Sequence, residues 1–189
     1  MKGTAIAAVP GPRPATTPVC APRPHAPAIA PTGRNAQVLP AKPGLVLFGV
    51  HGGAGTSTLV RLLDPGYSGR VVEWRYGMPV DAARVPVLVA RSTAAGLAAA
   101  AVWVTRWRPD LRRPALMVVA DVPFRVPPLV RYRQRALASR VTAVIDVPYL
   151  YPLRHLDDPA QALRQRKVAA AVERVRRQLD QLSASVSGG

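Results

Sequence analysis

From residue 44 onward, short apolar runs alternate with longer segments in which apolar residues recur at helical spacing. Short runs rich in branched residues are typical of buried strands, and the segments between them are typical of helices that cover a sheet. The pattern predicts strands at residues 44–50, 71–74, 85–91, 115–121 and 141–147, and helices at 56–63, 94–107 and 127–138. This alternation indicates a three-layer α/β domain with a mostly parallel, five-stranded sheet over residues 44–158.

A last helix is predicted over residues 159–183, because Asp158 can cap it and Pro159 suits the first helical position. Its apolar residues form one stripe, at spacings of four and three: Val168, Val172, Val175, Leu179 and Leu182. Such a long amphipathic helix docks on its own domain or on another chain. Docking on its own domain is the more frequent use, and residues 168–182 are also a candidate surface for a protein partner or a homodimer. Residues 184–189 are expected to form a flexible end.

Residues 1–43 have a different composition, with 10 of the 21 prolines and no acidic residue. Proline removes backbone donors, and the segment offers little apolar surface to bury, so we expect a disordered Pro/Arg-rich tail. The tail is either a tether or basic arm for an acidic partner, or an inert extension.

The chain has 189 residues, is 49% hydrophobic and carries a formal net charge of +16. This length and hydrophobicity suffice for one domain with a sizeable core. The excess of arginine attracts polyanions such as nucleic acid or anionic lipid, although the arginines are scattered over the whole chain. One functional hypothesis is therefore a nucleic-acid-associated accessory protein of plasmid partition or conjugation, which binds through the arginine-bearing helices and the basic tail. Clustering of four arginines on one face of the domain would favour this hypothesis: Arg131, Arg135, Arg174 and Arg177.

The single cysteine, Cys20, excludes a disulfide framework within the chain, which suits the cytoplasm. His25, His51 and His155 form no ligand set with it, so a zinc site is not expected. The sequence contains no uncharged apolar run of the ~20 residues that a membrane span needs. We therefore expect a cytoplasmic protein without a membrane span.

The candidate chemistry lies where the first predicted strand meets the first helix. Four glycines fall within seven positions, at Gly49, Gly52, Gly53 and Gly55, and Thr56-Ser57-Thr58 follows at once. Glycines let a backbone fold closely around an anion, and the first N–H groups of a helix have no internal partners. The pattern predicts a phosphate-binding loop; the alternative is a glycine-rich turn that binds nothing.

The loop His51-Gly52-Gly53-Ala54-Gly55-Thr56-Ser57-Thr58 resembles the deviant Walker A motif of MinD/ParA-type P-loop ATPases, K-G-G-x-G-K-[ST]-[ST]. The resemblance implies a fold of the P-loop NTPase type that binds ATP or another nucleotide with magnesium through these eight residues. In that family one lysine contacts the β- and γ-phosphates and the other serves catalysis across a dimer. Here His51 and Thr56 replace both, and no lysine stands between Lys42 and Lys167. His51 either touches a phosphate when protonated or simply fills the loop.

Asp121 is the second candidate site residue, and two alignments place it differently. In the first, Asp121-Val122-Pro123 resembles the D-x-P of the family's switch II segment, and Ser57 and Asp121 would share a magnesium ion. In the second, residues 85–93 resemble the strand after switch II and residues 144–149 resemble the last strand, so Asp121 lies on the base-contacting strand. We favour the second, because a whole ordered set of landmarks fits it. The combination of the motifs at residues 52–58, 87–97, 118–123 and 147–149 also resembles a family of shortened MinD/ParA-like proteins from actinobacteria, which implies no particular activity.

The sequence therefore favours a catalytically impaired P-loop protein that binds a nucleotide or another phosphate through Gly52 to Ser57 and acts as a regulatory or partner-binding module. Loss of the lysine removes a main source of charge stabilisation for a transferring γ-phosphate. Besides the nucleic-acid hypothesis, a slow ATPase completed by a residue of another chain is a third possibility, with Arg61 or Arg91 contributing in cis.

Overall fold

The computed structural model describes residues 44–187, and side-chain burial up to residue 184. The predicted tail at residues 1–43 lies outside the described residues, so the structure does not bear on it. The predicted flexible end begins inside the last helix, which continues to Ser187.

The sheet has five strands, all parallel, in the order β2-β1-β3-β4-β5. The strands are β1 (Gly44–Gly49), β2 (Val71–Glu73), β3 (Arg84–Arg91), β4 (Ala115–Val119) and β5 (Val144–Val147). The predicted α/β class and strand number are thus correct, and the expectation of a mostly parallel sheet becomes a fully parallel one. The central strands β1, β3 and β4 are apolar almost throughout, as expected for strands that are covered on both faces.

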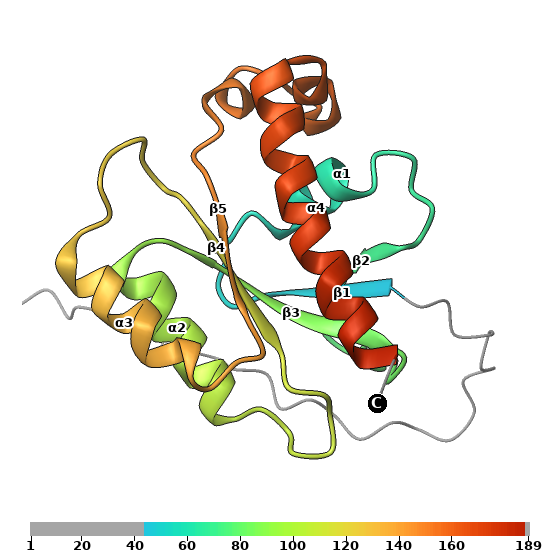
Figure 1. Ribbon diagram of the computed structural model, residues 1–189, viewed down its shortest axis with the longest axis vertical. Helices are drawn as coiled ribbons and strands as arrows, with labels where there is room; N and C mark the ends of the chain where they lie inside the picture. Colours follow the sequence, from blue (N-terminus) through green and yellow to red (C-terminus); the bar gives the residue numbers. More distant parts are fainter. Residues whose placement is uncertain (1–43, 188–189) are drawn as a thin grey trace, which may run out of the picture.

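Helices cover both faces of the sheet (Figure 1). The helices α1 (Thr56–Leu63) and α4 (Arg166–Ser187) pack on one face, and α2 (Ala94–Thr105) and α3 (Pro128–Ala138) pack on the other. On the second face, Phe48 of β1 stacks on Trp74 and meets Trp103 and Trp107 edge-on or tilted. These tryptophans are therefore packing residues of the core on this face.

The C-terminal segment contains more elements than the single helix predicted from Pro159. Two 3-10 helices, η1 (Tyr151–Arg154) and η2 (Pro159–Arg164), precede α4. Asp158 does cap an element, because its carboxylate accepts a hydrogen bond from the N–H of Ala160, but that element is η2. The extended backbone of Gln165 (φ −84°, ψ 118°) then separates η2 from α4.

The apolar stripe of α4 is buried within its own chain. Val168, Val172, Val175 and Leu179 are each at most 4% exposed and belong to the same core cluster as β1 and α1. The guanidinium of Arg176 also donates to the carbonyl oxygen of Leu62 in α1, at 2.8 Å. These four side chains therefore pack against the rest of the domain.

Because all strands are parallel, their carboxyl ends lie at one edge of the sheet, and the loops that carry the candidate site residues gather there. This edge brings together the glycine-rich loop after β1, Arg91 at the end of β3, Asp121 after β4 and the segment 148–159 after β5. Among the described helices, none combines the length and the apolar character needed to cross a membrane.

Candidate phosphate-binding site

The loop between β1 and α1 is shaped by glycines at three positions. A Cβ atom on Gly49 would lie 2.6 Å from Oγ1 of Thr56, so only glycine lets the helix start this close to the strand end. Gly53 and Gly55 have φ values of +78° and +91°, a region that L-residues with side chains rarely adopt. The glycine spacing thus has a conformational reason in the close helix start and the two positive φ values.

The loop leaves a set of backbone donors unused. The N–H of Ala54 donates to the carbonyl oxygen of His51, at 3.3 Å. Within the part of the chain that the structure describes, six other loop amides have no hydrogen-bond partner: those of Gly52, Gly53, Gly55, Thr56, Ser57 and Thr58. These residues line an open hollow of about 640 Å³, together with Glu73, Trp74, Arg91 and Trp103. Clustered free N–H groups at a helix start are what an anion requires.

His51 uses both ring nitrogens to hold the loop. Nδ1 donates to the carbonyl oxygen of Gly52, at 2.9 Å, and Nε2 accepts from the backbone N–H of Arg91, at 3.3 Å. A carbonyl can only accept and an N–H can only donate, so this arrangement requires a neutral ring with its proton on Nδ1. Of the two alternatives for His51, the geometry matches loop filling rather than contact with a phosphate.

Ser57 faces a carboxylate that the sequence analysis did not single out. Its Oγ lies 2.9 and 3.1 Å from the two carboxylate oxygens of Glu73, the last residue of β2. β2 pairs with β1, so the end of β2 lies beside the glycine-rich loop. The one signal available in the sequence was a carboxylate at the end of a predicted strand; that this strand neighbours β1 is not visible there.

Asp121, which the first alignment paired with Ser57 at a metal ion, has another partner in the structure. Its Oδ1 accepts a hydrogen bond from Nη1 of Arg91, at 2.6 Å, and its backbone N–H donates to Oγ of Ser92. The Nε of Arg91 also donates to the carbonyl oxygen of Gly53, at 3.0 Å. Ser57 is thus joined to Glu73, and Asp121 is joined to Arg91 and through it to the loop.

Ser57 and Glu73 both offer oxygen atoms as ligands. Magnesium prefers such hard oxygen donors to nitrogen or sulfur, so the two side chains suit this ion. Among the described residues, no group of three or more histidine, cysteine, aspartate and glutamate side chains could hold a metal by itself. Magnesium here would therefore need water molecules and ligand phosphates to complete its coordination.

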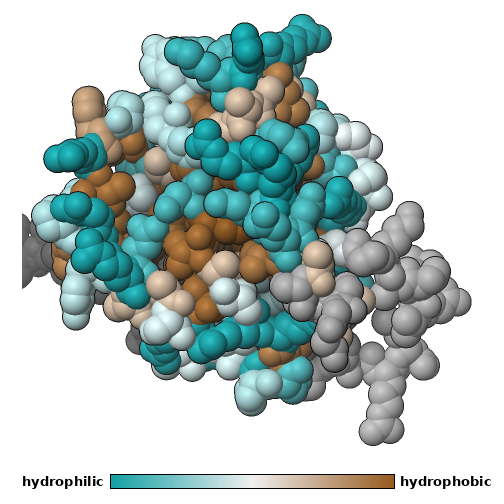
Figure 2. Space-filling model, in the orientation of Figure 1, coloured by the Kyte–Doolittle hydropathy of each residue, from teal (hydrophilic) through white to brown (hydrophobic). Residues whose placement is uncertain are grey.

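The arginines proposed for nucleic-acid contact do not share one face. Arg131 and Arg135 lie on α3 and Arg174 and Arg177 on α4, and these helices cover opposite faces of the sheet. All four side chains are exposed. In the view of Figure 2, hydrophilic side chains lie over both helices, with hydrophobic surface between them, over β5.

Comparison of the chain with models of protein families, with curated proteins and with solved structures finds no match. The functional argument therefore depends on the loop and on the residues that the fold gathers around it.

Proposed function

We propose that the protein binds a nucleotide or another phosphate compound through the backbone N–H groups of Gly52 to Ser57, and that it works as a regulatory or partner-binding module rather than by turnover. The observation that supports this most is the set of six unpartnered amides lining one hollow at the start of α1. Such a set offers an anion several hydrogen bonds at once, and the dipole of α1 adds to them.

Magnesium is part of the proposal. Ser57 and Glu73 would hold the ion on the β2 side of the loop, where their oxygen atoms already lie within hydrogen-bond distance of each other. Bound there, the ion would neutralise charge on the ligand phosphates. Asp121 remains the alternative carboxylate for the metal, but this role would compete with its ion pair to Arg91.

The absence of turnover follows from the residues that replace the two family lysines. Thr56 supplies no positive charge, and both ring nitrogens of His51 are already hydrogen-bonded, to Gly52 of the loop and to Arg91 at the end of β3. Electrostatic stabilisation of the transferring phosphoryl group is the main catalytic contribution in phosphoryl transfer. A chain without it can bind phosphates and still hydrolyse them poorly.

The nucleic-acid hypothesis has less support, because the four arginines on α3 and α4 point to no single contact surface. Completion of an ATPase by a residue from another chain stays a possibility that only turnover measurements in the presence of a partner would address.

The test is a calorimetric titration of ATP and of inorganic triphosphate into the full chain, with and without magnesium. We expect saturable binding at micromolar to millimolar concentration, tighter with magnesium, and loss of binding in Gly55→Asp. The new side chain would project into the hollow, since nothing lies within 4 Å of a Cβ at Gly55, and its charge would repel phosphate. Trp74 and Trp103 line the hollow, so a change in tryptophan fluorescence gives a second readout.

Gly77→Asp is the matched control. Gly77 also has a positive φ, +85°, with open space around it, but it does not line the hollow. The control should bind as the unaltered chain does, because it carries a comparable backbone strain and the same added charge away from the loop. Equal binding in Gly55→Asp and the unaltered chain, or no binding up to millimolar ligand, would contradict the proposed function.

A further inference from the structure

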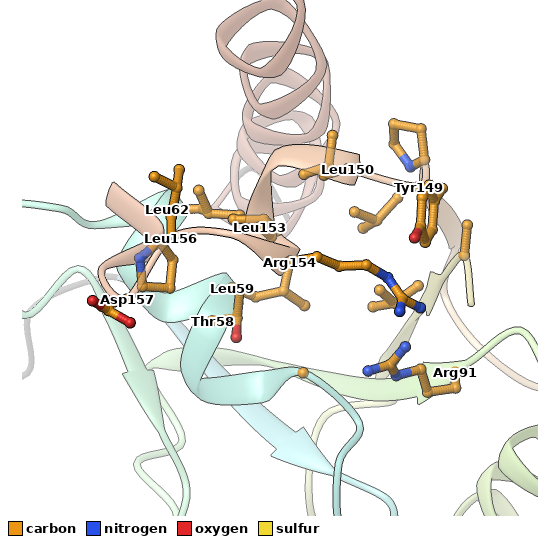
Figure 3. Close-up of a pocket in the computed structure, with 16 residues that line it drawn as sticks. Thr58, Leu59, Leu62, Arg91, Tyr149, Leu150, Leu153, Arg154, Leu156 and Asp157 are labelled. Carbon is orange, nitrogen blue, oxygen red and sulfur yellow. The ribbon is translucent and has the colours of Figure 1, made fainter. Parts of the chain in front are cut away.

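A second cavity adjoins the phosphate-loop hollow. It has a volume of about 520 Å³ and lies between α1, the carboxyl ends of β4 and β5, and the segment 148–159 (Figure 3). Gly55, Thr58 and Arg91 line both spaces. A ligand whose phosphates occupy the loop can therefore extend past Gly55 and Thr58 into this cavity.

Arg91 is held at the junction of the two spaces with part of its guanidinium free. Its Nε and Nη1 donate to Gly53 and Asp121, as described above, while Nη2 makes no hydrogen bond within the described part of the chain. The backbone of Arg91 is fixed by its pairing with Val119 in the adjacent strand β4. The side chain is 37% exposed, so its remaining donors can reach a ligand.

Arg154, the last residue of η1, lines the same cavity from the opposite side. Its guanidinium lies 5.6 Å from the ring centroid of Tyr149, a cation–π contact that orients it. Among the described residues it has no hydrogen-bond or ion-pair partner. All five N–H donors of this guanidinium are thus available.

The two guanidinium groups point toward one another across the cavity (Figure 3). Like charges that face each other repel, and the carboxylate of Asp121 compensates only Arg91. Asp157 also lines the cavity, but Figure 3 shows it at the other end, beyond Thr58. An anion between Arg91 and Arg154 would turn this repulsion into two charge-assisted contacts.

We infer that Arg91 and Arg154 form an arginine pair that binds a second phosphate group of the ligand, outside the glycine-rich loop. The inference rests on the proposed function, since the loop amides hold one phosphate and the arginine pair holds the next. The ligand class is accordingly a compound with two or more linked phosphates. A monophosphate reaches only one of the two subsites and binds more weakly.

Because Arg91 is paired with Asp121, the direction in which an Asp121 substitution changes ligand binding tests the role of Arg91. If Arg91 binds the ligand, removing the charge of Asp121 frees its guanidinium and strengthens binding. If Arg91 only braces the loop, the same change loosens the brace and weakens binding. Asp121→Asn therefore separates a binding residue from a structural one.

The experiment is calorimetric titration of inorganic triphosphate and of orthophosphate into the full chain without magnesium. We expect Arg91→Gln and Arg154→Gln each to weaken triphosphate binding about tenfold or more, because each removes a charge-assisted contact. Asp121→Asn is expected to strengthen it about threefold, as suits a partly exposed ion pair. Arg164→Gln is the matched control: it removes the same charge from an exposed residue that lines neither space, and should change binding less than about twofold.

Three outcomes would overturn the inference. If both arginine variants bind triphosphate normally and Gly55→Asp does not bind it, the arginine pair is contradicted as a subsite and the proposed function is supported. Weaker binding in Asp121→Asn would make Arg91 a brace. No binding of triphosphate by the unaltered chain would remove both the inference and the function on which it rests.

Discussion

Asp64 is a buried carboxylate that organises the turn from α1 to β2. It is 7% exposed and accepts hydrogen bonds from the N–H and hydroxyl of Ser68 and from the N–H groups of Gly69 and Val71. Burial by itself raises the pKa of Asp64, but the hydrogen bonds outweigh it, and the pKa lies below its ordinary value. The turn that they hold delivers the chain into β2 and so places Glu73 beside the loop.

Asp64→Asn is expected to lower the free energy of unfolding at pH 7 by about 1–2 kcal/mol, because the amide cannot accept all four hydrogen bonds. A carboxylate whose pKa is lowered by folding stabilises the protein above its unfolded pKa of about 3.9, and this contribution is lost as the pH falls through the folded pKa. The difference between Asp64→Asn and the unaltered chain should therefore shrink below about pH 4. Urea unfolding across this pH range measures it. A difference of the same size at every pH would mean that the charge of Asp64 is not what matters.

Residue-scale reasoning from the sequence reached some site residues and missed others. The glycines and Ser57 were predicted from local pattern, because positive φ values and a helix start are properties of a short segment. Glu73 was missed as a candidate site residue, and Asp121, which the less favoured of two alignments gave to a shared metal, pairs with Arg91 in the structure. Each of these contacts joins side chains from different strands, and residue spacing carries no information on which strands are neighbours.

At the scale of elements, α2 begins unusually close to the end of β3. Gly96 lies in the first turn of α2, where its N–H donates to the capping Oγ1 of Thr93. A Cβ atom there would lie 2.5 Å from the carbonyl oxygen of Arg91 and 3.1 Å from Nε2 of His51. This helix start therefore limits the space around the residues that hold the glycine-rich loop.

Gly96→Ala is expected to destabilise the fold by about 1–3 kcal/mol, because the added methyl group must displace backbone atoms. Helix propensity alone predicts the opposite, a gain of about 1 kcal/mol. The exposed Ala98 in the same helix provides a comparison: Ala98→Gly should cost about 1 kcal/mol, the ordinary propensity difference. Thermal and urea unfolding measure both variants. A Gly96→Ala variant more stable than the unaltered chain would show that the close approach is relieved at little cost.

The predicted element boundaries agree with the structure for α1 and differ for others: α2 ends at Thr105, β4 ends at Val119 and β5 begins at Val144. Helix α1 has the predicted limits, Thr56 and Leu63, since glycine precedes it and Asp64-Pro65-Gly66 follows. The C-terminal helix begins later than predicted. Asp158-Pro159 does start a helical element, but this element is the 3-10 helix η2. The start of α4 at Arg166 depends on how η2 and α4 pack on α1, which residue spacing does not show.

At the scale of the whole molecule, 26 basic residues face 10 acidic ones, which leaves a formal charge of +16. A large net charge of one sign destabilises the compact state through self-repulsion. Ion pairs within the described residues engage six of the ten acidic side chains, and most of these pairs are partly exposed, so they offset this charge only in part.

We therefore expect the full chain to become more stable as ionic strength rises, with a higher Tm between 20 mM and 300 mM sodium chloride by several degrees. Screening over a Debye length of about 8–10 Å at intermediate salt weakens the repulsion more than it weakens the ion pairs. Scanning calorimetry measures the shift. Repeating it with sodium sulfate separates screening from anion binding, because a bound anion adds a further, concentration-dependent rise. A Tm that falls with added sodium chloride would mean that the ion pairs outweigh the self-repulsion.

The sequence by itself determined the α/β class, the number of strands and their succession along the chain, and the position of the glycine-rich loop. These follow from local backbone preferences and from the period of apolar residues, which a single chain displays without its fold. Only the tertiary structure decided that β2 lies beside β1, that Glu73 faces Ser57, and that Arg91 and Arg154 line the same cavity. Strand order and the placement of the segments between strands depend on packing among distant parts of the chain, and each of these pairs joins residues from different elements.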